Sequence, residues 1–244
     1  MSSPVLAIDA ASSRLSVALG LGDAVESRHI DGPRRHAGAV LVLIDELLAP
    51  RDLAPRDLQR IVTGDGPGSF TGLRVAAAVA KALAWGRDEL EWWTAPSLLA
   101  RIPLAVQASR QAGTVLALSD ALRGELYAGC WRLADGIVTM LGPSPRAMTP
   151  EQLAGFGAVD HVIGTIPEPL MDRVRGATGR EPVTGDDALP DAANLIALLD
   201  RPGGARRVAD AATWRPEYGR PAEAQAVWER KHGRPLPDPS AGRG

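Results

Sequence analysis

A glycine-rich segment at residues 64–72 has the residue types best suited to holding a ligand. It follows an apolar run at 60–63 and precedes a long apolar stretch at 73–86, so it joins a predicted strand to a predicted helix. Glycines allow the backbone to approach a ligand closely, and free N–H groups at a helix N-terminus attract phosphate. A P-loop requires a Gly-Lys-Ser or Gly-Lys-Thr ending, whereas this segment reads Gly-Leu-Arg at 72–74. The residues alone therefore favour a structural turn at a packed interface over a phosphate site.

A second candidate for ligand binding follows the first predicted strand, where Asp9, Ser12 and Ser13 lie on a tight turn. Such a turn can hold a metal-bound phosphate through N–H and hydroxyl groups, with the carboxylate orienting waters on the metal. An Asx-type turn that needs no ligand accounts for the same residues. Taken alone, they favour the ligand-free turn.

Other reactive residue types lack suitable neighbours. His36 has no second histidine at helical ligand spacing, so no metal site is predicted. Cys130 is the single cysteine, which excludes an intramolecular disulfide and a multi-cysteine zinc site, and it is expected to be a small core residue. Ser69 and Thr71 do not lie in a Gly-x-Ser-x-Gly elbow, so the sequence gives no support for a serine hydrolase.

The elements that position these residues form two successive groups of strands and helices. The first group has the order β-β-β-α-β-α-β-α, and the second also begins with strands and continues with alternating helices. We therefore predict an α/β protein with domains at residues 1–110 and 111–232, followed by a proline-rich disordered tail at 233–244. Strands are expected near 5–8, 15–19, 24–30, 60–63, 91–94, 115–118, 125–133, 137–141 and 161–163, and helices at 36–49, at 73–86, after Pro96, from Pro150, and near Leu170 and Leu195.

Two of the predicted helices carry more apolar surface than one face of a sheet can cover. The helix at 36–49 has a broad apolar stripe, but Val42 lies between Asp45 and Glu46 on the opposite side. The helix at 73–86 is apolar on two flanks, one of them rich in alanine, with one narrow stripe of Arg74, Ala78, Lys81 and Trp85. We therefore predict that the two helices pack side by side and present a joint surface to a partner. The predicted partner-binding residues are Val40, Val42, Leu43, Leu47, Ser69, Phe70, Thr71, Arg74, Ala76, Ala77, Ala80 and Ala84.

Charge and hydropathy exclude several classes of protein. The 244 residues carry a formal net charge of -2, which gives no long-range field for attracting nucleic acid or an acidic membrane. If RNA is involved, another subunit must supply most of the phosphate contacts. The N-terminal residues do not resemble a signal peptide, and no window holds about 18 uninterrupted apolar residues. We expect a cytoplasmic protein that does not cross a membrane.

The segment at 66–74, Gly-Pro-Gly-Ser-Phe-Thr-Gly-Leu-Arg, resembles the signature of the TsaB (YeaZ) family over its whole length. Weaker matches to other motifs of the family follow in the same order along the chain. The resemblance is strong over residues 1–130, sparse over 140–210 and present again near 216–220. Residues 7–12 resemble the opening Ile-Asp-Thr-Ser, His36 resembles the His-Ser-Glu segment, 120–127 resemble Asp-Ala-Arg-x-Gly-Glu-x-Tyr, and 215–220 resemble the ending Pro-x-Tyr-Leu-Arg.

The resemblance implies an actin-like fold of two domains, with mixed sheets flanked by helices, as in the sugar-kinase and Hsp70 superfamily. It also implies a non-catalytic partner subunit, without a bound cofactor, in the bacterial complex that forms N6-threonylcarbamoyladenosine at position 37 of tRNA. The catalytic subunit of that complex is TsaD, and the ATPase TsaE joins it. The tRNA would be reached only through the complex, and a homodimer is expected as an alternative state of the free chain.

Departures from the family pattern favour the same non-catalytic role. Ala10 replaces the threonine of the first phosphate turn, Ala37 and Gly38 replace Ser-Glu, and residues 162–165 offer one glycine where an adenosine loop has two. The paired histidines of the catalytic relative are absent. Each departure removes a contact to a nucleotide or a metal, so we predict no catalytic residues.

Two enzymatic alternatives remain open from the sequence. An ATP-dependent phosphotransferase on the same fold would use Asp9 and Asp120 as its carboxylates, and tight ATP binding by the isolated chain would support it. A metallopeptidase is less well supported, because the sequence lacks paired histidines.

Overall fold

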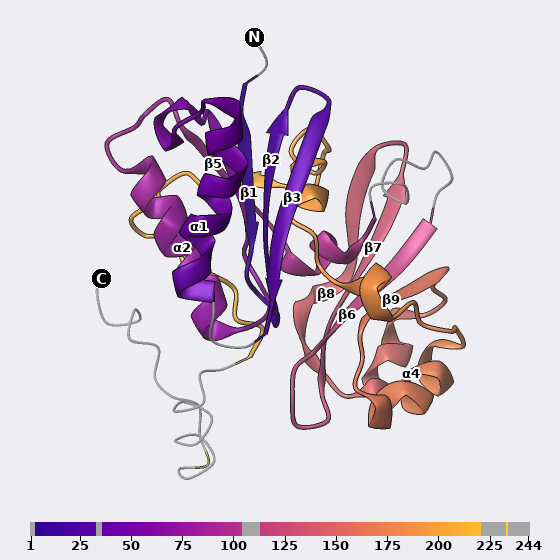
Figure 1. Ribbon diagram of the computed structural model, residues 1–244. Helices are drawn as coiled ribbons and strands as arrows, with labels where there is room; N and C mark the ends of the chain where they lie inside the picture. The colour runs from indigo at the N-terminus through magenta and orange to yellow at the C-terminus, as the bar shows by residue number, and fades with distance from the viewer. Residues whose placement is uncertain (1–2, 33–35, 104–112, 221–232, 234–244) are drawn as a thin grey trace.

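The computed structural model describes residues 3–32, 36–103, 113–220 and 233, which form two mixed β-sheets with helices on their outer faces (Figure 1). The first sheet has six strands in the order β10-β5-β4-β1-β2-β3, and the second has four in the order β8-β7-β6-β9. This arrangement confirms the predicted α/β fold with two mixed sheets flanked by helices. Within the described ranges, no helix has the length and apolar character that crossing a membrane requires.

The first sheet is built around three parallel strands, β5, β4 and β1. β1 pairs in parallel with β4 and antiparallel with β2. All residues of β1 are buried, as are all residues of β4 except Arg60, which is typical of strands covered on both faces. The strands of this sheet are β1 (Val5–Asp9), β2 (Arg14–Leu21), β3 (Ala24–Asp31), β4 (Arg60–Gly64), β5 (Glu91–Ala95) and β10 (Arg206–Arg207).

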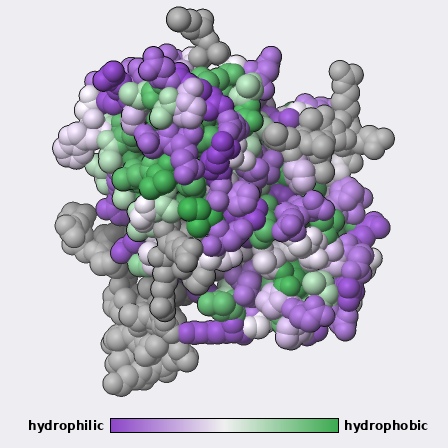
Figure 2. Space-filling view, viewed as in Figure 1, coloured by the Kyte–Doolittle hydropathy of each residue, from purple (hydrophilic) through white to green (hydrophobic). Residues whose placement is uncertain are grey.

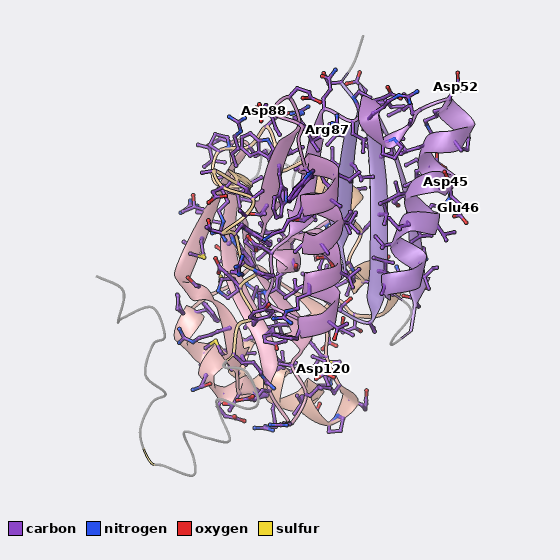
Figure 3. All side chains as sticks on the ribbon, turned by 90° about the vertical axis from the view of Figure 1, so that its left-hand side faces the viewer. Asp45, Glu46, Asp52, Arg87, Asp88 and Asp120 are labelled. Carbon is purple, nitrogen blue, oxygen red and sulfur yellow. The ribbon has the colours of Figure 1, made fainter. Side chains whose placement is uncertain are left out.

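The helices α1 (His36–Leu48) and α2 (Phe70–Ala84) lie side by side on one face of the first sheet (Figures 1 and 3). The short 3-10 helices η1 (Ala49–Arg51) and η2 (Pro55–Asp57) follow α1. α2 begins three residues before the predicted start, because the Ser69 hydroxyl caps it by accepting the Gly72 N–H at 3.2 Å. The apolar core between helices and sheet includes Leu6, Ile8, Leu15, Val17, Val40, Leu43, Leu47, Ile61, Ala76 and Ala80.

The second sheet is an antiparallel meander of β6, β7 and β8 with β9 added in parallel beside β6. The predicted hairpin is confirmed, and its turn residues Asp135 and Gly136 have positive φ angles of 50° and 76°. α4 and η4 pack together beside this sheet, where Leu153 and Val174 join its core. The elements of this part are β6 (Gly113–Asp120), β7 (Leu126–Ala134), β8 (Ile137–Met148), η4 (Pro150–Phe156), β9 (His161–Thr165), η5 (Glu168–Leu170), α4 (Met171–Thr178) and η6 (Gly185–Ala188).

A further apolar core fills the space between the two sheets and belongs to both. It contains η3 (Ser97–Arg101) and α5 (Ala193–Ile196) together with strand residues from each sheet. The helix predicted after Pro96 is thus a short 3-10 helix, consistent with the chain-breaking proline at 103. This core includes Val5, Ala7, Val62, Leu98, Leu99, Val115, Ala117, Trp131, Leu195 and Leu198.

The last described residues return to the first sheet. β10 pairs with β5 at the sheet's edge, and Trp214 packs on Trp92 with ring centroids 4.7 Å apart. The predicted domain boundary near residue 110 falls in 104–112, outside the described residues, so the division into domains stays a prediction. Residues 234–244 of the predicted tail also lie outside the described residues.

The guanidinium of Arg101 is buried between the two sheets and connects them. One nitrogen donates to the Thr165 hydroxyl at 2.6 Å and to the Ala188 carbonyl at 2.8 Å, and another donates to the Ser119 hydroxyl at 2.9 Å. Burial lowers the pKa of Arg101 to about 10, while the negative charge of Asp9 raises it. The group is therefore cationic at neutral pH.

We expect Arg101→Leu to lower the free energy of unfolding by about 3–5 kcal/mol, because it leaves buried acceptors and the Asp9 carboxylate uncompensated. Urea unfolding followed by tryptophan fluorescence measures the change. Asp9→Asn in the Arg101→Leu background should recover part of the loss, since it removes the unpaired charge. Equal unfolding midpoints for Arg101→Leu and the parent chain would contradict this role.

Candidate functional site

The glycine-rich segment forms a closed turn between β4 and α2. A Cβ atom on Gly66 would collide with the carbonyl oxygen of Glu217, and one on Gly68 would collide with the carbonyl oxygen of Ala11. The N–H of Ser69 donates to the same Ala11 oxygen at 2.7 Å. The glycines are needed because the protein's own backbone packs against the loop. This packing supports the interpretation of the segment as a structural turn.

The candidate phosphate turn is held by its own hydrogen bonds. The Ser12 hydroxyl accepts the Arg14 N–H at 3.1 Å and donates to the Arg14 carbonyl at 3.3 Å. Ser13 is exposed, whereas Asp9 and Ser12 line one small hollow. The structure thus brings together two of the three residues predicted for a vestigial phosphate turn.

Asp9 is a buried carboxylate whose two oxygens have no hydrogen-bond partner of good geometry among the described residues. Burial raises its pKa to about 6, although the Ser97 hydroxyl, the Arg101 charge and the backbone at Ala11 act to lower it. The hollow beside it has an empty volume of about 170 Å³, whereas pockets that bury small organic ligands have roughly 300–1,000 Å³. The hollow is therefore too small to bury an organic ligand. Its lining residues are Asp9, Ala11, Ser12, Pro67, Ser97, Leu98, Arg101 and Ser119.

The other residues considered for chemistry are engaged in the fold. Asp120 accepts the Leu122 N–H at 2.7 Å within its own turn. Gly164 lies in β9, where a Cβ atom would collide with the Leu118 carbonyl oxygen. Cys130 is buried in β7, and burial raises its pKa to about 11, which makes its thiol unreactive. Among the described residues, no group of three or more His, Cys, Asp or Glu side chains is arranged to hold a metal ion.

Large apolar side chains are exposed on the outer face of α1 and α2. The exposed fractions are 63% for Leu41, 53% for Val42, 46% for Phe70 and 86% for Trp85. Figure 2 shows apolar residues gathered over these helices, and in Figure 3 Asp45 and Glu46 point outward from α1. An exposed apolar patch with charged neighbours is typical of a protein-binding surface. We call the following exposed residues the helical surface: Leu41, Val42, Phe70, Thr71, Arg74, Ala78, Ala82 and Trp85.

Several of the predicted partner-binding residues are buried within the chain, which corrects the prediction. All are buried, and all but Ala77 belong to the core beside the first sheet, so a partner cannot reach them. The alanines on α2 allow a close approach to the chain's own sheet, and the prediction wrongly assigned that closeness to a partner helix. The corrected residues are Val40, Leu43, Leu47, Ala76, Ala77 and Ala80, and Ala84 is half-buried against the same core.

The remaining predicted residues, Val42 and 69–71 with Arg74, are exposed, and their contact with a partner stays a prediction. Leu41 and Trp85 were not among the predicted partner-binding residues, although both are exposed. A signal for Trp85 was present, because it shares a narrow helical stripe with the two cationic residues of α2.

The glycine-rich segment itself contains a buried carboxylate, that of Asp65. Arg206 donates to the Asp65 side chain at 2.8 Å and also to the side chain of Glu217. The Glu217 N–H donates to the Asp65 carbonyl oxygen at 2.7 Å. Burial raises the pKa of Asp65 to about 7; Arg206 lowers it, and Glu217 raises it further. The charge of Asp65 is therefore sensitive to pH near neutrality.

We expect the chain to lose stability as the pH rises from about 4 to about 7, because folded Asp65 holds its proton to a higher pH than the unfolded chain does. The folded state binds more protons in this window, so deprotonation favours unfolding. The loss is on the order of a few kcal/mol, since a tenfold change in proton affinity corresponds to about 1.4 kcal/mol.

Urea unfolding at several pH values in this window measures the slope, and Asp65→Asn should reduce it. Asp9→Asn is the matched comparison, because the raised pKa of Asp9 acts in the same direction at lower pH. A slope unchanged by Asp65→Asn would contradict the assignment.

Comparisons with known proteins agree with the fold and with the position of α1 and α2 described above. A model of the family described as TsaD, tRNA N6-adenosine threonylcarbamoyltransferase, matches residues 31–142, which include α1 and α2. The tRNA threonylcarbamoyladenosine biosynthesis protein TsaB of Bacillus subtilis is 28% identical over 229 residues, covering 91% of this chain and 96% of that relative. The protein of the same name from Haemophilus influenzae is 38% identical over 125 residues, or 50% of this chain and 51% of that relative.

The structural comparison extends over nearly the whole chain. YeaZ from Pseudomonas aeruginosa aligns with a TM-score of 0.70 and 27% identity, covering 88% of this chain and 99% of that protein. With the TsaD family match, this likeness confirms the actin-like fold that the resemblance implied. Because the sequence relatives, the fold and the ordered motifs agree, this chain belongs to the TsaB (YeaZ) family of tRNA threonylcarbamoyladenosine biosynthesis proteins.

Proposed function

We propose that this chain is a non-catalytic subunit that binds and supports a TsaD-like transferase during formation of N6-threonylcarbamoyladenosine on tRNA. The observation that carries the proposal is the helical surface. Its exposed leucine, valine, phenylalanine and tryptophan side chains lie on two neighbouring helices. Monomeric proteins seldom leave a contiguous apolar patch of this kind without a partner.

The TsaD family match suggests which partner fits the helical surface. The matched residues 31–142 contain both α1 and α2, so a TsaD-like subunit carries an equivalent pair of helices. Two related pairs can pack face to face around a pseudo-two-fold axis, as identical subunits do in a dimer. The same geometry allows a homodimer of the free chain, which would compete with the heterodimer.

The closed candidate phosphate turn supports a role without catalysis. The hollow beside Asp9 is too small for a nucleotide, and the Ser12 hydroxyl is bound to its own turn. The phosphotransferase alternative needs an open site at these residues. In the proposed complex, a TsaE-like ATPase supplies nucleotide hydrolysis, and the cytoplasmic tRNA is held chiefly by other subunits. The net charge of -2 is consistent with this division of roles.

We expect the purified chain to hydrolyse ATP no faster than a blank, because the candidate phosphate turn is closed. A coupled assay for ADP release measures this, with Asp9→Ala as the comparison. Turnover above the blank that disappears in Asp9→Ala would overturn the non-catalytic role and support the phosphotransferase alternative.

We expect Val42→Arg and Leu41→Arg to weaken binding of the TsaD-like subunit at least about 30-fold, which corresponds to about 2 kcal/mol. The physical reason is that each variant places a charge in an apolar contact. Both side chains are exposed, so the monomer should keep its circular dichroism spectrum and melting temperature. Calorimetric titration with the purified subunit measures the affinity.

Ile137→Arg is the matched control, because Ile137 is 48% exposed on β8 of the other sheet and should tolerate the charge without a change in affinity. Ala80→Arg is a contrasting variant, which should unfold the chain because Ala80 is fully buried. Normal binding by folded Val42→Arg and Leu41→Arg would remove the helical surface from the interface.

A further inference from the structure

Residues 206–220, which we call the C-terminal strap, join both sheets to the N-terminal end of α2. The strap begins as β10 beside β5, and the carbonyls of Ala212 and Trp214 accept hydrogen bonds from Lys81 of α2 at 3.3 and 3.2 Å. It then crosses the glycine-rich loop and reaches the second sheet. In Figure 1 its orange and yellow trace passes behind and below the helices of the first sheet.

The strap meets the helical surface at a cluster of Phe70, Arg74 and Tyr218. The rings of Phe70 and Tyr218 have centroids 4.7 Å apart, and the Arg74 guanidinium lies 4.1 Å from the Phe70 ring centroid. The Nε of Arg74 donates to the Tyr218 hydroxyl oxygen at 3.3 Å. Phe70 and Arg74 are exposed, so Tyr218 restricts two side chains that would otherwise sample several rotamers in solvent.

The backbone on both sides of Tyr218 is fixed. Glu217 donates its N–H to the Asp65 carbonyl, and the Gly219 carbonyl accepts the Ala147 N–H of β8 at 3.0 Å. A Cβ atom on Gly219 would collide with Pro67, so only glycine fits there. The position of Tyr218 therefore depends on the glycine-rich loop and on the second sheet together.

Arg74 keeps part of its hydrogen-bonding capacity for another molecule. Its Nε is used by Tyr218, and within the described residues its two terminal nitrogens have no hydrogen-bond partner. A guanidinium held in plane by stacking presents those nitrogens to a carboxylate with little further loss of entropy. The apolar residues beside it indicate a protein partner rather than a free anion.

We propose that Tyr218 is a positioning residue for partner binding: it holds Phe70 and Arg74 so that Arg74 pairs with a carboxylate of the TsaD-like subunit. This inference rests on the proposed function, because it assigns a role at the same surface. It also explains why the chain has a Pro-x-Tyr segment at 216–218 far from α2 in the sequence. Through the strap, the positions of Phe70 and Arg74 on the helical surface depend on the second sheet.

A double-mutant cycle with the full-length chain and the purified TsaD-like subunit tests the proposal. Tyr218→Ala and Arg74→Ala should each weaken binding about tenfold, and the double variant should also weaken it about tenfold because the two side chains act as one unit. Tyr218→Phe keeps the stacked ring and loses the hydroxyl, so it should retain most of the affinity. Added salt should reduce the difference between the parent chain and Arg74→Ala.

Met140→Ala, an exposed side chain on β8, is the control and should bind like the parent chain. If Tyr218→Ala does not fold, the cycle is run with Tyr218→Leu, which removes both the ring and the hydroxyl and whose loss of affinity should vanish in the Arg74→Ala background. Two outcomes would overturn this inference alone. One is that the losses of affinity in the two single variants add in the double variant. The other is that folded Tyr218 and Arg74 variants bind normally while Val42→Arg fails to bind. Normal binding by folded Val42→Arg and Leu41→Arg would overturn the proposed surface and this inference with it.

Discussion

The buried guanidinium of Arg101 is the constraint on which the meeting of the two sheets depends. Its donors need acceptors from β6, β9 and η6, and its charge needs the carboxylate of Asp9 nearby. A buried cation without such partners costs several kcal/mol, so the sheets are held at the separation that satisfies it. The same closeness leaves only a small hollow at the end of β1. The contact that joins the two sheets therefore also closes the candidate phosphate turn.

Because the candidate phosphate turn is closed, the function that we propose depends on the exterior of the chain. The first sheet has one face against the second sheet and the other against α1 and α2, so the proposed partner surface is the outer side of these helices (Figure 1). The exposed side chains there differ in kind from those around the hollow, because most of them are apolar, whereas serine hydroxyls, one carboxylate and one guanidinium line the hollow. Such a surface is suited to association rather than to chemistry.

The sequence predicted local elements well and long-range contacts poorly. Alternation and apolar runs located every strand of the two sheets except β10 (Arg206–Arg207), because side-chain period and turn residues are local signals. The partner face was less accurate, since Ala76 and Ala80 were assigned outward although they pack on the sheet. The strap was recognised only as a short motif, because its contacts join residues far apart, as with Arg206 and Asp65, which are 141 positions apart. No period or spacing within a segment encodes such a pairing.

Helix α2 illustrates why periodicity alone cannot identify a partner surface. Ala76 and Ala80 allow the helix to lie close to the sheet, and larger side chains there would push it away from β4. Lys81, on another side, donates to the strap, so a charge on a helix does not always mark the side that faces solvent. The exposed residues of α2 are Phe70, Thr71, Arg74, Ala78 and Ala82, and Trp85 follows at its C-terminal end. The other sides of the helix have neighbours within the chain. A helix that is apolar nearly all round therefore indicates, in the first place, that several elements of its own chain pack against it. Only those of its residues that stay exposed in the structure indicate a partner.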